Sequence, residues 1–341
     1  MTINLISDTV TKPCTKMLEF MMNSKVGDDV FKEDPTVNEL ENMLAKMFGK
    51  ESALFFPSGT MANQTAIKIH TEPGDQLICD KYAHVYNYEG GGVSFNSGVS
   101  CKLIDGHRGM FTNEQVINSI NPPDFYHSPK TSLVCVENTT NKGGGACWDI
   151  NELIKIKKTC KQNNLSYHLD GARIWNAMVE TNTKPIQYGE IFDSISICLS
   201  KGLGCPVGSV LLGTSEFINK AIRVRKVLGG GMRQAGYLAA CGIYALNNNV
   251  IRLKEDHLKA IEIEHILSKL NYIKKVERVE TNILIFQLTS NIDSNTFLEK
   301  MSENDVKLIS MGDNKLRIVT HKDYIDEMHQ KFIKILRNFK I

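Results

Sequence analysis

Short apolar runs alternate with amphipathic segments over residues 1–249. Runs rich in β-branched residues and bounded by Gly, Asn or Asp are typical of strands, and apolar residues three and four positions apart are typical of helices. We predict strands at 76–79, 100–104, 132–136, 165–169, 194–199 and 207–212. We predict helices at 15–23, 112–120, 149–162, 215–224 and 234–248, and one through Met47 that opens at the capping-box pair Thr36 and Glu39. The alternation predicts an α/β fold with a largely parallel sheet, whose ligands bind at the carboxyl ends of its strands.

The pattern changes after Asn247-Asn248-Asn249. We predict a charged helix, a strand, a second helix, two strands and a last helix, at 251–270, 281–288, 294–304, 306–310, 315–320 and 323–338. We therefore place a domain boundary near residue 249 and expect a large domain over 1–249 and a small α+β domain over 250–341. Residues 1–15 are expected to form a loop or arm of the large domain.

Two of the predicted strands end in a reactive side chain. The strand at 165–169 leads into Asp170, and the strand at 194–199 leads through Ser200 into Lys201, with a glycine after each reactive residue. An amine desolvated in such a turn has a lowered pKa, which suits a nucleophile for a carbonyl group. Pyridoxal 5'-phosphate (PLP) requires this pair, because the lysine bonds to its aldehyde and the acid keeps the pyridine nitrogen protonated. These residues therefore predict a PLP site.

Small residues precede a further helix. Pro57-Ser58-Gly59-Thr60 leads into an apolar-periodic segment that runs toward His70. A turn of this kind leaves backbone N–H groups free at the positive end of the helix dipole, where they bind phosphate. Taken alone, the motif is better explained as an ordinary capped helix start, since glycine turns before helices are common. Its occurrence in order with Asp170 and Lys201 favours the phosphate site.

Composition and charge exclude several other classes. The chain has 341 residues, of which 42% are hydrophobic and 23% charged, so it can bury a large core. Its net charge is only +2, so we expect neither nucleic acid nor a membrane as a partner. Its nine cysteines show no CxxC motif and no zinc-ligand spacing, so we expect reduced thiols and no metal site. Because the first residues lack a signal or spanning pattern, we expect a cytoplasmic protein.

Seven segments, taken in order, resemble the low-specificity L-threonine aldolases, PLP enzymes of the aspartate aminotransferase-like fold type I. The segments are Ser7-Asp8-Thr9-Val10-Thr11, Val26-Gly27-Asp28-Asp29-Val30, Pro57-Ser58-Gly59-Thr60-Met61-Ala62-Asn63-Gln64, Glu137-Asn138-Thr139, His168-Leu169-Asp170-Gly171-Ala172-Arg173, Leu199-Ser200-Lys201-Gly202-Leu203-Gly204 and Gly229-Gly230-Gly231-Met232-Arg233-Gln234. The likeness runs from residue 2 to about 257 and resumes at 316–321. It implies a homotetramer whose active sites lie at subunit interfaces, with PLP as the cofactor. It also implies retro-aldol cleavage of L-threonine and L-allo-threonine to glycine and acetaldehyde.

The resemblance also implies roles for individual residues. Those it implies for catalysis are Lys201, which would bond to the cofactor, and His84 and His127, which would handle the proton of the substrate hydroxyl. Those it implies for cofactor binding are Ser58, Gly59, Thr60, His84, Asp170, Arg173, Ser200, Lys201 and Arg233. Those it implies for substrate binding are Ser7, Arg173, Arg317 and Lys226. A bidentate Arg317 would fix the substrate carboxylate, and a histidine with a pKa near working pH would take the hydroxyl proton.

The sequence departs from the family pattern at two positions. Ile6 stands where the family often has Arg, and Thr140 where it often has His, so a polar contact near the site is expected to be lost. The composition of the segment 122–129 around His127 also differs from the usual one. His168 is left unassigned, because strand parity and its neighbour Asp170 give no clear direction for its side chain.

Other functions remain open at this point. A β-eliminating amino-acid lyase or an aminotransferase on the same scaffold would release pyruvate and ammonia or exchange an amino group. A nucleotide-binding protein is disfavoured, because Gly208 comes one residue too late after Gly202 and Gly204 for GxGxxG and no GxxxxGK[ST] occurs. An inactive scaffold is disfavoured by the presence of Lys201, Asp170 and Arg173. The sequence does not decide between threonine and allo-threonine, which aldehydes are accepted, which histidine is the base, or which subunit supplies Lys226 and Arg233.

Overall fold

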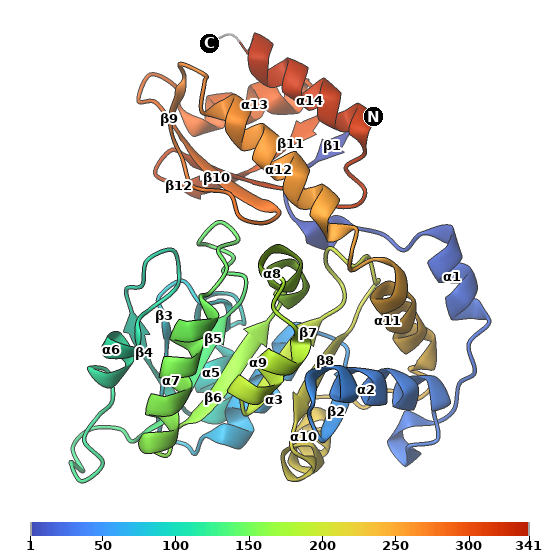
Figure 1. Cartoon of the computed structure of the whole chain (residues 1–341), viewed down its shortest axis with the longest axis vertical. Helices are drawn as coiled ribbons and strands as arrows, with labels where there is room; N and C mark the ends of the chain where they lie inside the picture. The colour runs from blue at the N-terminus through green and yellow to red at the C-terminus, as the bar shows by residue number, and fades with distance from the viewer. Residues whose placement is uncertain (1, 340–341) are drawn as a thin grey trace.

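A computed structural model of the chain describes residues 2–339 (Figure 1). Its larger, lower body is built on a seven-stranded sheet in the order β2-β8-β7-β6-β5-β3-β4. The strands are β2 (Ser52–Phe56), β3 (Gln76–Asp80), β4 (Ser100–Ile104), β5 (Thr131–Glu137), β6 (Ser166–Gly171), β7 (Ser194–Cys198) and β8 (Ser209–Gly213). Only β8 runs antiparallel to its neighbours, β2 and β7, among these pairs of described strands. The predicted α/β fold with a mostly parallel sheet is confirmed.

Helices cover both faces of this sheet, so its inner strands are buried along nearly their whole length. They are α1 (Thr15–Met22), α2 (Pro35–Phe48), α3 (Gly59–His70), α4 (His84–Asn87), α5 (Gly92–Ser97), α6 (Asn113–Ile117), α7 (Ile150–Gln162), α8 (Ile174–Thr181), α9 (Pro185–Ile191), α10 (Ser215–Val227) and α11 (Gly236–Asn248). Alternate residues of β2 face opposite ways. Leu54 and Phe56 pack with α3 and α10, whereas Phe55 joins the core formed with α2. The short turns η1 (Asp8–Val10) and η2 (Asp29–Phe31) complete the helical elements of this body.

The start of α2 differs from the prediction. Its N-cap is Asp34, whose Oδ1 accepts the N–H groups of Thr36 (3.1 Å) and Val37 (3.0 Å), and Pro35 fills the first helical position. Thr36 is therefore inside the helix, and the predicted capping box with Glu39 is wrong. The reason is that the Asp-Pro pair two residues earlier already satisfies the free N–H groups.

The smaller, upper body carries a four-stranded antiparallel sheet in the order β12-β13-β10-β9. Its elements are α12 (Leu253–Leu267), β9 (Ile273–Val276), β10 (Ile283–Leu288), α13 (Ser294–Glu303), β11 (Val306–Lys307), β12 (Ile309–Gly312), β13 (Lys315–Val319) and α14 (Asp326–Asn338). The predicted strand at 306–310 is two strands, β11 and β12, and β9 was not predicted. The three helices and this sheet enclose a second hydrophobic core.

The first residues of the chain join the smaller body. Strand β1 (Ile3–Asn4) pairs in parallel with β11, and Ile3 and Leu5 are buried in the core of the smaller body. The N–H of Val319 donates to the carbonyl of Leu5 at 2.9 Å. The chain then passes between the two bodies as a blue arm and forms η1 above the large sheet (Figure 1). The arm thus links both bodies at the end of the sheet where a ligand is expected. Within residues 2–339, no helix has the length and apolar character needed to cross a membrane.

Candidate active site

A cavity of about 240 Å3 opens at the carboxyl ends of β6 and β7, beside the N-terminus of α3. It collects seven of the predicted site residues: Ser58, Gly59 and Thr60 at the start of α3, His84 of α4, Asp170 of β6, and Ser200 and Lys201 after β7. The carboxyl ends of neighbouring parallel strands meet at one edge of a sheet, which is why residues so far apart in sequence converge here.

Asp170 has a free acceptor aimed into this region. Its Oδ1 accepts the N–H of Ala172 at 3.1 Å, whereas its Oδ2 is buried and has no hydrogen-bond partner. A buried carboxylate oxygen without a donor is costly, so a group that donates to it would be bound favourably. A protonated pyridine nitrogen is such a donor, so the residues present fit PLP.

Lys201 is surrounded by anionic groups. Burial lowers the pKa of its amine, but the Cys198 thiol, Asp8 and Asp170 outweigh burial and hold that pKa above its ordinary value. The expected lowering is therefore wrong for the protein without cofactor, because burial was considered without its neighbours. Burial raises the pKa of Cys198, but the charge of Lys201 and the hydrogen bonds with Ser200 and Lys201 together outweigh burial and leave that pKa lowered. Each group thus favours the charged form of the other.

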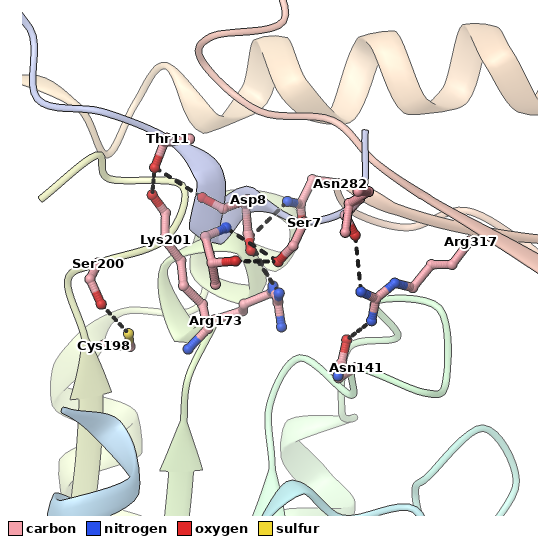
Figure 2. Close-up of polar contacts among 12 residues, drawn as sticks. Ser7, Asp8, Thr11, Asn141, Arg173, Cys198, Ser200, Lys201, Asn282 and Arg317 are labelled. Carbon is pink, nitrogen blue, oxygen red and sulfur yellow. Dashed lines mark hydrogen bonds and ion pairs between the residues drawn. The ribbon is translucent and has the colours of Figure 1, made fainter. Parts of the chain in front are cut away.

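The turn that carries Lys201 is fixed from outside the sheet. The backbone carbonyl of Lys201 accepts the hydroxyl of Thr11 at 2.7 Å (Figure 2). Ser200 Oγ lies 3.5 Å from Cys198 Sγ. The backbone of this turn is therefore anchored to the arm.

The N-terminus of α3 supplies donors for an anion. Ser58 is the N-cap, and its Oγ accepts the N–H of Met61 at 3.2 Å. The N–H groups of Gly59 and Thr60 lie in the first turn, where a helix provides no acceptor of its own. With the hydroxyls of Thr60 and Ser200 lining the same cavity, these groups can hold a phosphate at the positive end of the helix dipole.

His84 lies against two acidic groups. Its Nδ1 is 3.0 Å from Oε1 of Glu89, and His84, Glu89 and Asp170 each place one polar atom within 4.8 Å of the others. Burial lowers the pKa of His84, but the hydrogen bond to Glu89 and the charges of Asp170, Glu89 and Glu137 raise it above 6.5 overall. Glu89 is buried and also accepts the side-chain amides of Asn63 (2.9 Å) and Gln64 (2.6 Å). Glu89 therefore orients the ring of His84.

His168, left unassigned from the sequence, has a structural role. It is fully buried, with Nδ1 at 2.8 Å from Ser194 Oγ and Nε2 at 3.1 Å from Asn63 Oδ1. Burial lowers its pKa to about 3, so it is neutral at ordinary pH. It bridges the sheet to α3 and does not line the cavity.

Arg173 forms a bidentate ion pair with Asp8 of the arm. Its Nε donates to Oδ2 at 2.8 Å and its Nη2 to Oδ1 at 2.7 Å, and both side chains are buried (Figure 2). The side-chain amide of Asn282, from the smaller body, also donates to Oδ2 at 3.2 Å. Sequence reasoning gave Asp8 no role, although it lies in the Ser7-Asp8-Thr9 motif. This carboxylate joins the arm and both bodies at one point.

Arg317 approaches from β13. Its Nη1 donates to Asn141 Oδ1 at 2.7 Å and its Nη2 to the carbonyl of Ile6 at 3.0 Å, while its buried Nε has no partner. Burial, and then the nearby charge of Arg173, lower the pKa of Arg317. Two guanidinium groups that repel each other favour an anion between them. At position 6, where the family often has Arg, the contact with Arg317 is therefore made by the backbone carbonyl of Ile6 and not by its side chain.

Ser7 lies at the turn between these two arginines. Its Oγ accepts the N–H of Thr9 at 3.2 Å and the hydroxyl of Thr9 at 2.8 Å (Figure 2). Thr9 lines the cavity, whereas Ser7 does not. The arm therefore brings Ser7 to the edge of the site.

Six predicted residues do not line the cavity: besides Ser7, Arg173 and Arg317, they are His127, Lys226 and Arg233. His127 is exposed in the segment before β5, where it packs on Phe125 and Tyr126, at the amino end of a strand whose carboxyl end faces the site. Lys226 is exposed in the last turn of α10. Arg233 donates to Asp28 Oδ2 at 2.8 Å and is about half exposed. None of the three lines the cavity within this chain.

The chain is similar to several known proteins over most of its length. Residues 4–291 match the model of the beta-eliminating lyase family. The low specificity L-threonine aldolase of Escherichia coli is 42% identical over 322 residues, covering 94% of each chain, and low-specificity L-threonine aldolase 1 of Arabidopsis thaliana is 39% identical over 327 residues, covering 94% of this chain and 91% of that protein. The structure of the threonine aldolase of Leishmania major superposes with a TM-score of 0.85 at 19% identity and covers 98% of each chain.

Proposed function

The chain belongs to the beta-eliminating lyase family and, within it, to the low-specificity L-threonine aldolases, and from this premise we propose that it binds PLP and cleaves L-threonine and L-allo-threonine to glycine and acetaldehyde. One observation carries the proposal. Lys201 and Asp170 line one cavity beside a helix N-terminus, and Asp170 has a buried oxygen that lacks a donor. An amine, an acid and an anion site of this kind are what PLP requires.

Seven residues of the cavity would have a role toward the cofactor. Lys201 would bond to its aldehyde carbon, Asp170 would accept from its pyridine nitrogen, and His84 would lie against its ring. Ser58, Gly59, Thr60 and Ser200 would hold its phosphate. Once bound, the cofactor supplies an electron sink for the pair released when the substrate Cα–Cβ bond breaks.

The arginines hold the substrate. Arg317 and Arg173, with Ser7, would bind its carboxylate between them, which orients the bond to be broken. Arg173 is itself held by Asp8, so its orientation is fixed before substrate binds. Fixing the reactive geometry in advance removes an entropic part of the barrier.

His84 would take the proton of the β-hydroxyl. Its ring must be neutral to do so, and Glu89 fixes the ring orientation. Because its neighbours raise the pKa of His84 above 6.5, we expect activity to fall as the pH drops through that raised pKa. As the hydroxyl loses its proton, the carbonyl of acetaldehyde forms and the Cα–Cβ bond breaks.

The function is tested by product analysis. The purified protein is incubated with PLP and either L-threonine or L-allo-threonine, and glycine and acetaldehyde are quantified. Equal amounts of the two products support the proposal. The alternative is a β-eliminating amino-acid lyase, the activity for which the matched family is named. Release of pyruvate and ammonia from L-serine, with no glycine formed from either threonine, would favour that alternative.

Asp170→Asn should lower kcat for L-threonine by roughly 10^2- to 10^4-fold, the range for groups that control a proton in catalysis. The amide cannot keep the pyridine nitrogen protonated, so the electron sink weakens. Steady-state kinetics at saturating PLP measure the effect. Ser166→Ala, at the other end of β6, is the matched control and should keep wild-type kcat. Wild-type kcat in Asp170→Asn would show that the acid has no such role.

We further propose a homotetramer in which neighbouring subunits complete each site. Lys226, Arg233 and His127 do not line the cavity of their own chain, and in this arrangement they would act at the site of another copy. Large apolar side chains are exposed beside two of them, with Val227 78% and Phe31 69% exposed. Light scattering on the purified protein tests this point, and a monomer would exclude it.

A cytoplasmic setting fits nine cysteines that are all unpaired.

A further inference from the structure

Glu137 is a buried carboxyl group at the end of β5, and the reaction described above gives it no role. It is 6% exposed and pairs in register with Asp170 of β6. Its Oε2 accepts the backbone N–H of His84 at 2.9 Å, and its Oε1 accepts the backbone N–H of Asn141 at 2.8 Å. A single carboxyl group thus connects two loops that are 57 residues apart in sequence (141 − 84).

Each of these loops carries part of the proposed chemistry. One begins with His84, whose ring lies in the cavity. The other presents Asn141, whose Oδ1 accepts from Arg317 at 2.7 Å (Figure 2). The path from the histidine to the carboxylate-binding arginine therefore runs through both oxygens of Glu137.

We propose that Glu137 is a positioning residue that fixes the spacing between His84 and Arg317 by accepting one backbone N–H from each loop. This inference rests on the proposed function, because it assigns both ends of the connection from that reaction. A misplacement of about 1 Å in such a site can cost on the order of 10^2-fold in rate, so a fixed spacing matters.

This role depends on the charge state of Glu137. Burial, then the charge of Asp170, raise its pKa to about 7, while the N–H groups of Asn141 and His84 and the charge of His84 lower it. The ionisable groups that interact electrostatically with Glu137 include Asp170 of β6, Arg173 after β6, His84 of α4 and Cys135 of its own strand. The ionised form accepts both N–H groups, whereas protonation turns one oxygen into a donor.

The substitution Glu137→Gln tests this positioning role without changing the size of the side chain. The amide keeps one acceptor oxygen but turns an NH2 group toward the other N–H, so one loop loses its anchor. We expect kcat/KM for L-threonine to fall by about 10- to 10^2-fold, with unchanged PLP content. Glu137→Ala frees both loops and should lower kcat/KM further. Asn141→Ala removes only the link to Arg317, so it should raise KM while kcat stays near wild type.

A second readout does not depend on catalysis. In the cofactor-free protein, hydrogen exchange at the amides of His84 and Asn141 should speed up at one site in Glu137→Gln and at both in Glu137→Ala. Asp75→Asn is the matched control, because Asp75 is a buried carboxylate at the opposite end of the same sheet. Its Oδ2 accepts the N–H of Glu72 (2.9 Å) and the hydroxyl of Ser132 (2.6 Å). It should lower the melting temperature without changing kcat, KM or exchange at either amide.

The outcomes separate the two proposals. Wild-type exchange at both amides in Glu137→Ala, or wild-type kcat/KM in Glu137→Gln, would overturn the role of Glu137. An equal kinetic defect in Asp75→Asn would also overturn it, because the effect would then reflect general loss of stability. If the wild-type protein does not cleave threonine, the proposed function fails, and the exchange rates still decide whether Glu137 holds the two loops.

Discussion

Lys201→Ala is expected to lower kcat/KM for L-threonine by at least about 10^4-fold, the scale seen when a residue of the catalytic centre is removed. The lysine amine is the only nucleophile that the account assigns to the cofactor aldehyde. The fold should persist, because the contact that anchors this turn uses the backbone carbonyl of Lys201, which alanine keeps. Coupled detection of acetaldehyde at saturating PLP measures the loss.

The control for this variant is a lysine on a strand of the same sheet. Lys102 lies on β4 and is exposed, so Lys102→Ala should retain wild-type kcat/KM. Circular dichroism of both variants checks that the fold is kept. If Lys201→Ala retained more than about one hundredth of wild-type activity, the amine would not be the nucleophile that its place in the cavity implies.

Asp8→Asn is expected to lower the free energy of unfolding by about 3–5 kcal/mol, the cost of leaving a buried charge without its partner. Asp8 is fully buried and Arg173 is 5% exposed, so water cannot replace the lost carboxylate. The variant also weakens the link to Asn282 of the smaller body. Urea unfolding near neutral pH measures the change.

The same ion pair makes the free energy of unfolding depend on pH in the acidic range. Burial alone would raise the pKa of Asp8, but the charge and hydrogen bonds of Arg173, helped by Lys201 and Asn282, lower it to about 2. The stabilising contribution is therefore complete above about pH 4 and is lost as the pH falls from about 4 to about 2. In Asp8→Asn the free energy of unfolding should vary less over that window.

A surface ion pair provides the control. Glu216 and Lys220 pair at 2.8 Å on α10, and both are well exposed. Glu216→Gln should leave unfolding unchanged, because exposed pairs are screened by water. Equal effects of Asp8→Asn and Glu216→Gln would contradict the view that burial makes the Asp8–Arg173 pair strong.

The sequence was sufficient for those parts of the site that are defined locally. Asp170, Lys201 and the Ser58-Gly59-Thr60 turn each end or begin an element with a recognisable pattern, so their convergence follows from the parallel sheet. Most of the longer strands and helices were predictable for the same reason, although β2, α8 and α9 were not among the predicted elements. Elements as short as β1 and β9 were not, since two to four residues carry too little periodicity to identify a strand.

The remaining site residues depend on contacts that are distant in sequence. Asp8 meets Arg173 across 165 residues, and Glu137 meets His84 across 53. Both acids lie in segments shared with the family, but only their tertiary partners define what they do. The raised pKa of Lys201 has the same origin, because burial could be predicted from the sequence whereas the neighbouring acids and thiol could not.

The most direct test of the account is to locate the cofactor bond. The protein is loaded with PLP, reduced with borohydride and digested, and its peptides are analysed by mass spectrometry. We expect a single pyridoxyl label, on the peptide that contains Lys201, and none in Lys201→Ala. A label on a different lysine, or no label on a protein that cleaves threonine, would contradict it.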